Sequence, residues 1–102
     1  MNAVLYDKPA GELYSARSSL KPTNFYCDAP SAKSVQIAGD FNQWHPVPMH
    51  QRVDGWWFIQ MLLPHGHHQY HFLVDGRPTL DPQASGTARD DDNHPLSLVA
   101  VS

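Results

Sequence analysis

Residues 54–76, DGWWFIQMLLPHGHHQYHFLVDG, contain the clearest structural pattern in the chain. Two apolar runs flank the turn-forming residues 64–67. In each run large apolar side chains occupy every second position, which predicts β-strands because successive side chains on a strand point to opposite faces. The positions that share one face are Trp57, Ile59, Met61 and Leu63 in the first run and Tyr70, Phe72 and Val74 in the second. We predict that the two runs pair as a β-hairpin with this face buried.

The expected hairpin register pairs Leu63 with His68, Met61 with Tyr70, Ile59 with Phe72 and Trp57 with Val74. The other face of the same hairpin is also apolar, because Trp56, Phe58, Leu62 and Leu73 would lie on it. A solvated sheet face is normally polar, so we expect this face either to be covered by another element or to bind a partner.

The rest of the chain consists of short runs between turn residues. Nine prolines and six glycines leave little room for helices in 102 residues. Further runs with alternating or β-branched apolar residues occur at 24–28, 35–37 and 96–101. Regularly spaced short strands of this kind predict an all-β sandwich or barrel.

Composition excludes several classes of function. The net charge is −3 and the seven Lys and Arg residues are scattered, so no basic surface for nucleic acid is expected. The longest apolar stretch, 56–63, is interrupted by Gln60 and is far too short to span a membrane. Cys27 is the single cysteine, which excludes a disulfide framework within the chain. The sequence starts without a basic, apolar leader, so we expect a cytoplasmic protein.

The length suits a single domain. Residues 1–22 lack the alternating pattern, and we predict an N-terminal extension there, either partly disordered or docked on the sheet, followed by a β-sandwich domain over residues 23–102. The extension carries four large apolar side chains, those of Leu5, Tyr6, Leu13 and Tyr14. We expect them to dock on a sheet edge or on a second copy of the domain, which would make the protein a homodimer.

Candidate catalytic groups are few. Glu12 is the only glutamate. Asp54, Asp75 and Asp81 stand in the turn motifs VDG, VDG and LDP, where Asp accepts hydrogen bonds from the local backbone. We therefore expect no catalytic residues and no cofactor.

Candidate metal ligands are concentrated in two places. Four histidines, His65, His67, His68 and His71, lie within seven residues, and imidazole is a common metal ligand. However, His68 and His71 are three positions apart, so their side chains would point to opposite faces of the expected strand. The acidic run 90–92 lacks the alternating ligands and the terminal Glu of a calcium loop. We therefore expect no metal site.

The stretch 38–44, AGDFNQW, places two aromatic residues in a turn directly after a strand. Burial of a Trp side chain contributes about 2–3 kcal/mol, so a Trp in a turn often fills the core. An exposed Trp in a turn can instead serve as a binding platform. The residues alone leave both interpretations open for Trp44.

From Phe25 to Val101 the sequence resembles carbohydrate-binding module family 48, which includes the glycogen-binding domain of the AMP-activated protein kinase β subunit and the early-set domains of isoamylases and branching enzymes. The matching motifs, in the same order and with similar spacing, are APSAKSVQIAGDFNQW (29–44), DGWW (54–57), LPHGHHQYHFLVDG (63–76), LDP (80–82) and DNHPLSLVAV (92–101). The resemblance implies an immunoglobulin-like early-set β-sandwich of about seven short strands. It also implies noncatalytic binding of α-1,4-glucans such as glycogen and starch, with a glycogen-metabolising enzyme or a kinase-like protein as a further partner.

The resemblance implies a carbohydrate site position by position. Trp44 occupies the position of a sugar-stacking Trp, His71 occupies the position of a Lys in the family's YKF motif, and Asn93 matches an Asn that contacts sugar hydroxyls. Pro78 stands where a second stacking Trp is usual, and 89–92 stand where the family has an aliphatic residue. The nearest candidate for another ring is Trp56, whereas its neighbour Trp57 matches a structural core Trp.

Loss of one platform predicts weak binding. One sugar face covering about 100 Å² of indole contributes about 2.5 kcal/mol, and a dissociation constant of 1 mM already requires about 4 kcal/mol. We therefore expect millimolar affinity or weaker for short glucans, with tighter binding only to a multivalent polymer. The alternative is a protein-interaction or regulatory module on the same fold, with reduced or lost glucan binding, that uses the apolar face of Trp56, Phe58, Leu62 and Leu73.

Overall fold

The computed structural model describes residues 20–102. Most of the predicted extension, including its four large apolar residues, lies outside the described residues. Among the described residues the first strand begins at Lys21, so the last two residues of the segment 1–22 already belong to the sheet. The boundary between extension and domain stays a prediction.

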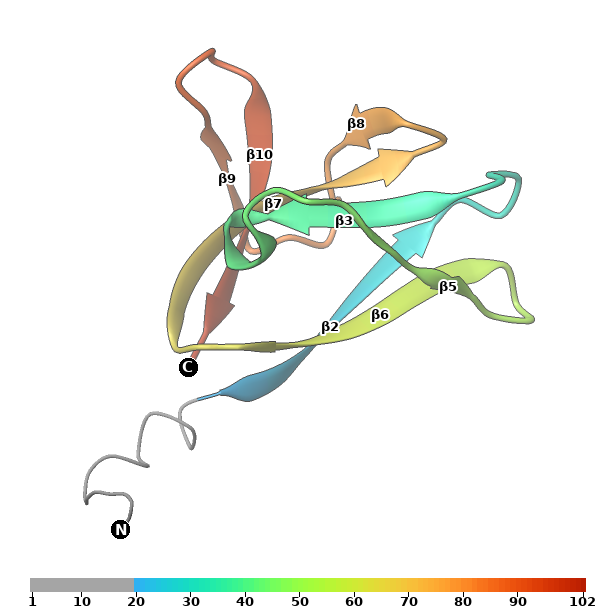
Figure 1. Ribbon diagram of the computed structural model, residues 1–102, viewed down its shortest axis with the longest axis horizontal. Coiled ribbons are helices and arrows are strands. Elements are labelled where there is room, and N and C mark those ends of the chain that lie inside the picture. Colours follow the sequence, from blue (N-terminus) through green and yellow to red (C-terminus); the bar gives the residue numbers. More distant parts are fainter. Residues whose placement is uncertain (1–19) are drawn as a thin grey trace, which may run out of the picture.

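Two antiparallel sheets form the sandwich (Figure 1). The smaller sheet has the strand order β2-β6-β5 and the larger sheet has the order β4-β3-β7-β10-β9, with β8 paired to β7. The strands are β2 (Lys21–Asp28), β3 (Val35–Gly39), β4 (Val47–Pro48), β5 (His50–Gln51), β6 (Trp56–Leu63), β7 (Gly66–Val74), β8 (Arg77–Thr79), β9 (Gly86–Arg89) and β10 (Pro95–Val101). The all-β, immunoglobulin-like prediction is confirmed, and no helix within residues 20–102 is long and apolar enough to cross a membrane.

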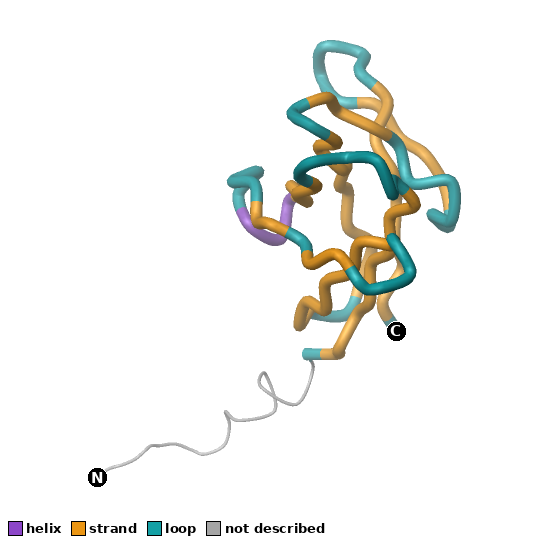
Figure 2. Tube along the Cα trace, turned by 90° about the vertical axis from the view of Figure 1, so that its right-hand side faces the viewer, coloured by secondary structure: helices purple, strands orange, loops and turns teal. Residues whose placement is uncertain are grey.

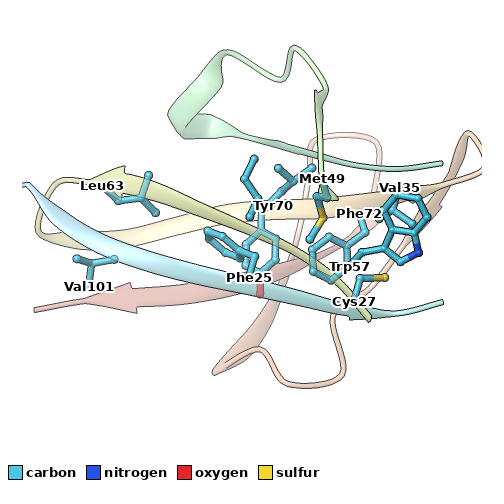
Figure 3. Packing of buried hydrophobic residues seen from close by; sticks show 11 residues of the cluster. Phe25, Cys27, Val35, Met49, Trp57, Leu63, Tyr70, Phe72 and Val101 are labelled. Carbon is cyan, nitrogen blue, oxygen red and sulfur yellow. The ribbon is translucent and has the colours of Figure 1, made fainter. Parts of the chain in front are cut away.

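The core lies between the two sheets and uses the alternating residues that the sequence indicates (Figure 3). Phe25 from β2 packs edge-on against Tyr70 from β7, with ring centroids 4.9 Å apart. Trp57 from β6 is only 8% exposed, and its indole N–H donates a 2.8 Å hydrogen bond to the carbonyl of Ala29. Trp57 is therefore part of the core, as its place on the predicted buried face indicates.

The predicted β6–β7 hairpin is wrong. β6 pairs with β2 and β5, whereas β7 pairs with β3, β8 and β10, so the connection 64–65 carries the chain from one sheet to the other. The expected buried faces nevertheless meet, because Ile59 and Phe72 both lie in the core. Alternation shows which side chains point inward, but strands that face each other across a core satisfy it as well as strands that lie side by side.

The single apolar face predicted for that hairpin consequently does not exist. Trp56, Phe58 and Leu62 belong to β6 and lie on the outer face of the smaller sheet, while Leu73 belongs to β7 of the larger sheet. On the smaller sheet, the rings of Phe58 and Tyr26 are 5.3 Å apart.

The three aspartates predicted in turns lie in turns. The Asp54 carboxylate accepts the Trp56 N–H at 3.0 Å, and the Asp75 carboxylate accepts the Lys33 and Ser34 N–H groups at 2.9 and 3.0 Å. Asp81 accepts the Gln83 N–H at 2.9 Å. It also accepts a 2.6 Å hydrogen bond from the buried Tyr70 hydroxyl, which fastens the loop after β8 to the core.

Candidate functional site

The loop after β3 separates its two aromatic residues, turning one inward and one outward. Gly39 provides space for the inward one, since a Cβ at this position would lie 2.6 Å from the Phe41 ring and 2.8 Å from the Gln69 carbonyl oxygen. The Phe41 ring stacks on Phe25 of the core with centroids 5.8 Å apart. Phe41 is therefore the residue of this loop that fills the core, although the sequence raised that interpretation for Trp44.

Polar side chains fix the same loop. The short 3-10 helix η1 (Asp40–Asn42) lies at the side of the strands (Figure 2). The Asp40 carboxylate accepts the Gln69 N–H at 3.0 Å and lies 3.1 Å from Nδ1 of His68. The Asn42 side-chain oxygen accepts the Gly39 N–H at 2.9 Å. Gly, Asp and Asn in this motif thus build the turn.

Trp44 leaves this turn in a backbone conformation that few residues adopt. Its φ angle is 60° and that of Gln43 is 54°, both in the left-handed region that costs free energy for residues other than glycine. The Trp44 N–H donates to the Gly39 carbonyl at 2.9 Å, which closes the loop. The side chain is 39% exposed. The turn therefore holds a large ring in contact with solvent.

His71 lies beside that ring. Its centroid is 5.5 Å from that of Trp44, in an edge-to-face arrangement. Its neighbours on β7, Tyr70 and Phe72, point into the core, so His71 points out of the larger sheet. Burial lowers the pKa of His71, and the nearby Asp90 carboxylate opposes the shift. The imidazole is therefore neutral near pH 7, with one nitrogen donating and the other accepting.

A hollow opens next to His71. It is lined by His71, Pro78, Leu80, Asp90, His94 and Pro95. The position at which the resemblance implies a second stacking Trp thus lies at this hollow, occupied by a proline. The sequence analysis does not select His94 and Leu80 as site residues, although each lies within a motif of the resemblance, DNHPLSLVAV (92–101) and LDP (80–82).

Asn93 lies at the tip of the loop between β9 and β10. It has a φ of 67°, its N–H donates to the Asp90 carbonyl at 2.9 Å, and its carbonyl accepts from the Arg89 guanidinium at 2.8 Å. Its side chain is exposed, and the following residue, His94, lines the hollow. Asn93 itself is not among the residues that line the hollow, but it lies between two that are, Asp90 and His94, in the same loop.

Trp56, the fourth predicted site residue, lies elsewhere. It pairs with Asp28 in the smaller sheet and lines a different pocket. The structure brings Trp44 and His71 together with the loop of Asn93, but it does not place Trp56 beside the hollow at His71.

One group of possible metal ligands occurs within residues 20–102. Ligand atoms of Asp90, Asp92 and His94 lie within 4.8 Å of one another, and all three residues are exposed. The Asp90 carboxylate accepts the N–H groups of Asp92 and His94 at 2.9 and 2.8 Å, and these bonds lower its pKa. In the structure these residues close the β9–β10 loop.

Comparison with known proteins gives concordant matches. Residues 21–102 match the family described as the glycogen recognition site of AMP-activated protein kinase. Over 68 residues, or 66% of this chain, the sequence is 40% identical to 5'-AMP-activated protein kinase subunit beta-1 of Sus scrofa and 38% identical to that of Homo sapiens. Over 62 residues, or 55% of the chain, it is 44% identical to a 1,4-alpha-glucan branching enzyme of Lactobacillus acidophilus. The matched regions cover 53%, 24% and 10% of these relatives.

Proposed function

Because this chain belongs to the family of the glycogen recognition site of AMP-activated protein kinase, we propose that it binds α-1,4-glucans through Trp44, His71 and Asn93 without catalysing a reaction on them. The observation that carries this site is the exposed Trp44 ring, held by its turn against His71 at the edge of a hollow. The family match supports the ligand class, and the geometry supports the choice of residues.

Trp44 supplies the apolar contact. The C–H-rich face of a glucose ring packs on the indole and removes about 100 Å² of apolar surface from water, for a contribution of about 2.5 kcal/mol. The turn already holds the ring in place, so little conformational entropy is lost on binding.

His71 and Asn93 supply hydrogen bonds. A neutral imidazole accepts from one hydroxyl and donates to another, and the amide of Asn93 does the same. Because a hydroxyl group of the sugar exchanges bonds with water for bonds with protein, each net contribution is about 1 kcal/mol. These groups fix the orientation of the sugar more than they raise affinity.

Pro78 limits the affinity. With one ring instead of two, the site provides little more than the approximately 4 kcal/mol that a millimolar dissociation constant requires. We propose that useful binding depends on many chain ends or segments of one polymer.

Native gel electrophoresis in glycogen tests the proposal. We expect the chain to be retarded in gels that contain glycogen relative to gels without polymer, and short maltodextrins to compete only at millimolar concentration. No retardation in glycogen or in long linear maltodextrins would contradict the proposed function.

A protein-interaction role is the second candidate. Its supporting observation is the outer face of the smaller sheet, where Leu62 is 62% exposed on the same strand as Phe58 of the Tyr26–Phe58 pair. The partner would be a glycogen-metabolising enzyme or a kinase-like protein in the cytoplasm, or a second copy of this chain. Light scattering of the parent and of Leu62→Asp tests the second copy, because only a homodimer loses mass on this substitution.

A further inference from the structure

A second pocket lies apart from the candidate sugar site. It opens between the end of strand β2 and the segment 79–87, which runs from β8 into β9, and encloses about 760 Å³. It shares Thr79 and Leu80 with the hollow at His71, but neither Trp44 nor His71 lines it. Small-molecule sites typically enclose about 300–1,000 Å³, so this pocket, here called the Asp81 pocket, has the size of a binding site.

Most of the side chains around the Asp81 pocket are apolar. They come from both sheets and from the loop after β8, and they are Tyr26, Ala29, Trp56, Val74, Leu80, Pro82 and Ala84. Such walls favour a ligand with an apolar body, because its burial removes apolar surface from water. Tyr26 and Trp56 also provide aromatic surface, which attracts cations as well as apolar groups.

The carboxylate of Asp81 is held in place at this pocket. One oxygen accepts the Tyr70 hydroxyl at 2.6 Å and the other accepts the Gln83 N–H at 2.9 Å. The Asp81 N–H donates in turn to the Ser97 hydroxyl at 2.8 Å. Both donors to the carboxylate are neutral, and each of its oxygens has a second lone pair. The pocket therefore holds a preorganised acceptor whose charge these donors do not neutralise.

A second carboxylate, that of Asp28, also belongs to the lining. Burial is the main cause that raises the pKa of the Cys27 thiol to about 11, and the charges of Asp81 and Asp28 raise it too. Cys27 lines the same pocket, so both carboxylates act on this space. Within residues 20–102 no Lys or Arg lines the pocket or forms an ion pair with either carboxylate.

We propose that the Asp81 pocket binds a small organic cation, with its ammonium group toward Asp28 and Asp81 and its apolar or aromatic body against the apolar wall. A cation compensates the two carboxylates, whereas an anion is repelled and a neutral ligand leaves their charge unbalanced. Partial exclusion of water strengthens the attraction. The inference does not rest on glucan binding, because the sugar site uses other side chains.

Two matched probes test the proposal. Tryptamine and tryptophol share the indole and the two-carbon chain, and they differ in ending with an ammonium or a hydroxyl group. Each is titrated into the complete 102-residue chain at pH 7 while backbone amide NMR shifts are recorded. We expect tryptamine to shift the amides of 27–29 and 81–87 and to bind about tenfold more tightly than tryptophol.

Asp28→Asn should weaken tryptamine binding by about fivefold and leave tryptophol binding within about twofold of the parent. Asp91→Asn is the matched control, because it removes the same charge from an exposed position outside the pocket. It should leave both affinities within about twofold of the parent.

Thr87→Trp blocks the pocket. Thr87 lines it and pairs with the buried Ser97, so a side chain at this position points between the sheets. The added indole should abolish binding of both probes, while unchanged β7 amide shifts show that the domain remains folded.

Four results would overturn the proposal. They are the absence of shifts with both probes, tryptophol binding as tight as that of tryptamine, an Asp91→Asn effect as large as that of Asp28→Asn, and shifts that persist in Thr87→Trp.

Discussion

Two tryptophans thirteen positions apart show how differently this fold treats the same side chain. Trp57 stands at an inward position of β6, is 8% exposed and donates its indole N–H to Ala29. Trp44 stands in a turn, is 39% exposed and touches the outward-facing His71. Packing holds Trp57, whereas backbone hydrogen bonds and the side chains of 40–42 hold the turn that carries Trp44.

The difference separates stability from binding. A ring at an inward-facing position of a strand is part of the core, and its loss leaves a cavity. A ring displayed by a polar turn with positive φ angles contributes little to the core, and the conformational cost of the turn is consistent with a binding role. The following predictions test this separation, from the largest expected effect to the smallest.

Trp57→Ala should have the largest effect. It removes a buried ring and one of the two donors to the Ala29 carbonyl, which keeps the Ala32 N–H, so we expect a loss of about 3–5 kcal/mol in the free energy of unfolding. A loss of this size is a large fraction of the stability of a small domain. Urea unfolding measures it, and a loss below about 1 kcal/mol would contradict the assignment of Trp57 to the core.

Tyr70→Phe should have the next largest effect on stability. It keeps the ring but removes the hydroxyl that donates to Asp81 at 2.6 Å, for an expected cost of about 1–3 kcal/mol. Tyr26→Phe serves as the control, since Tyr26 lies on the outer face of the sheet. Equal unfolding free energies for the two variants would show that the Asp81 loop is not fastened through Tyr70.

Pro78→Trp should raise affinity instead of stability. Pro78 lies on the peripheral strand β8 at the hollow beside His71, so an indole there adds a second platform. We expect glycogen binding to tighten by up to about 2 kcal/mol, or roughly thirtyfold. A fall in melting temperature with unchanged retardation would show that Pro78 serves the turn and that the site cannot accept a second ring.

The smallest effect concerns pH. Burial lowers the pKa of His71, so its ring is neutral near pH 7 and becomes protonated below the ordinary value of about 6.5, which removes the accepting nitrogen. Because the folded pKa is the lower one, folding stability from this group is complete above about pH 6.5 and decreases as the pH falls below it. Glucan affinity should be constant above pH 7 and weaken below 6.5.

His71→Gln should flatten this pH dependence. Asp90 and His94 line the same hollow, so His94→Gln is measured in parallel and should keep the profile of the parent. Equal affinity of the parent at pH 5 and pH 8 would contradict a hydrogen bond from a sugar hydroxyl to neutral His71.

Much of the fold, but less of the site, could be predicted from the sequence. Alternation identified the inward residues of β6 and β7 because burial imposes it directly. It could not assign these strands to different sheets, since the same inward faces satisfy both arrangements. The short strands β4 and β5 have only two residues each, too few for a period to appear.

For the candidate site, sequence motifs indicate residues that the fold brings close together. Trp44 and His71 belong to separate motifs, and the structure brings their rings to 5.5 Å. Trp56 was chosen for its chemistry alone, and it lies on the other sheet. His94 could not be selected from the sequence in this way. It lies in a loop, and neither residue alternation nor secondary-structure propensity predicts the backbone path that brings a loop residue to a site.

The glycogen retardation and the free energy of unfolding of Trp44→Ala, measured on one preparation, test the central claim most directly. If Trp44 is the binding platform, the variant loses its retardation in glycogen while its free energy of unfolding stays within about 1 kcal/mol of the parent. If the variant is still retarded, or loses about 3 kcal/mol or more, Trp44 is not the platform or belongs to the core, and the proposed site is wrong.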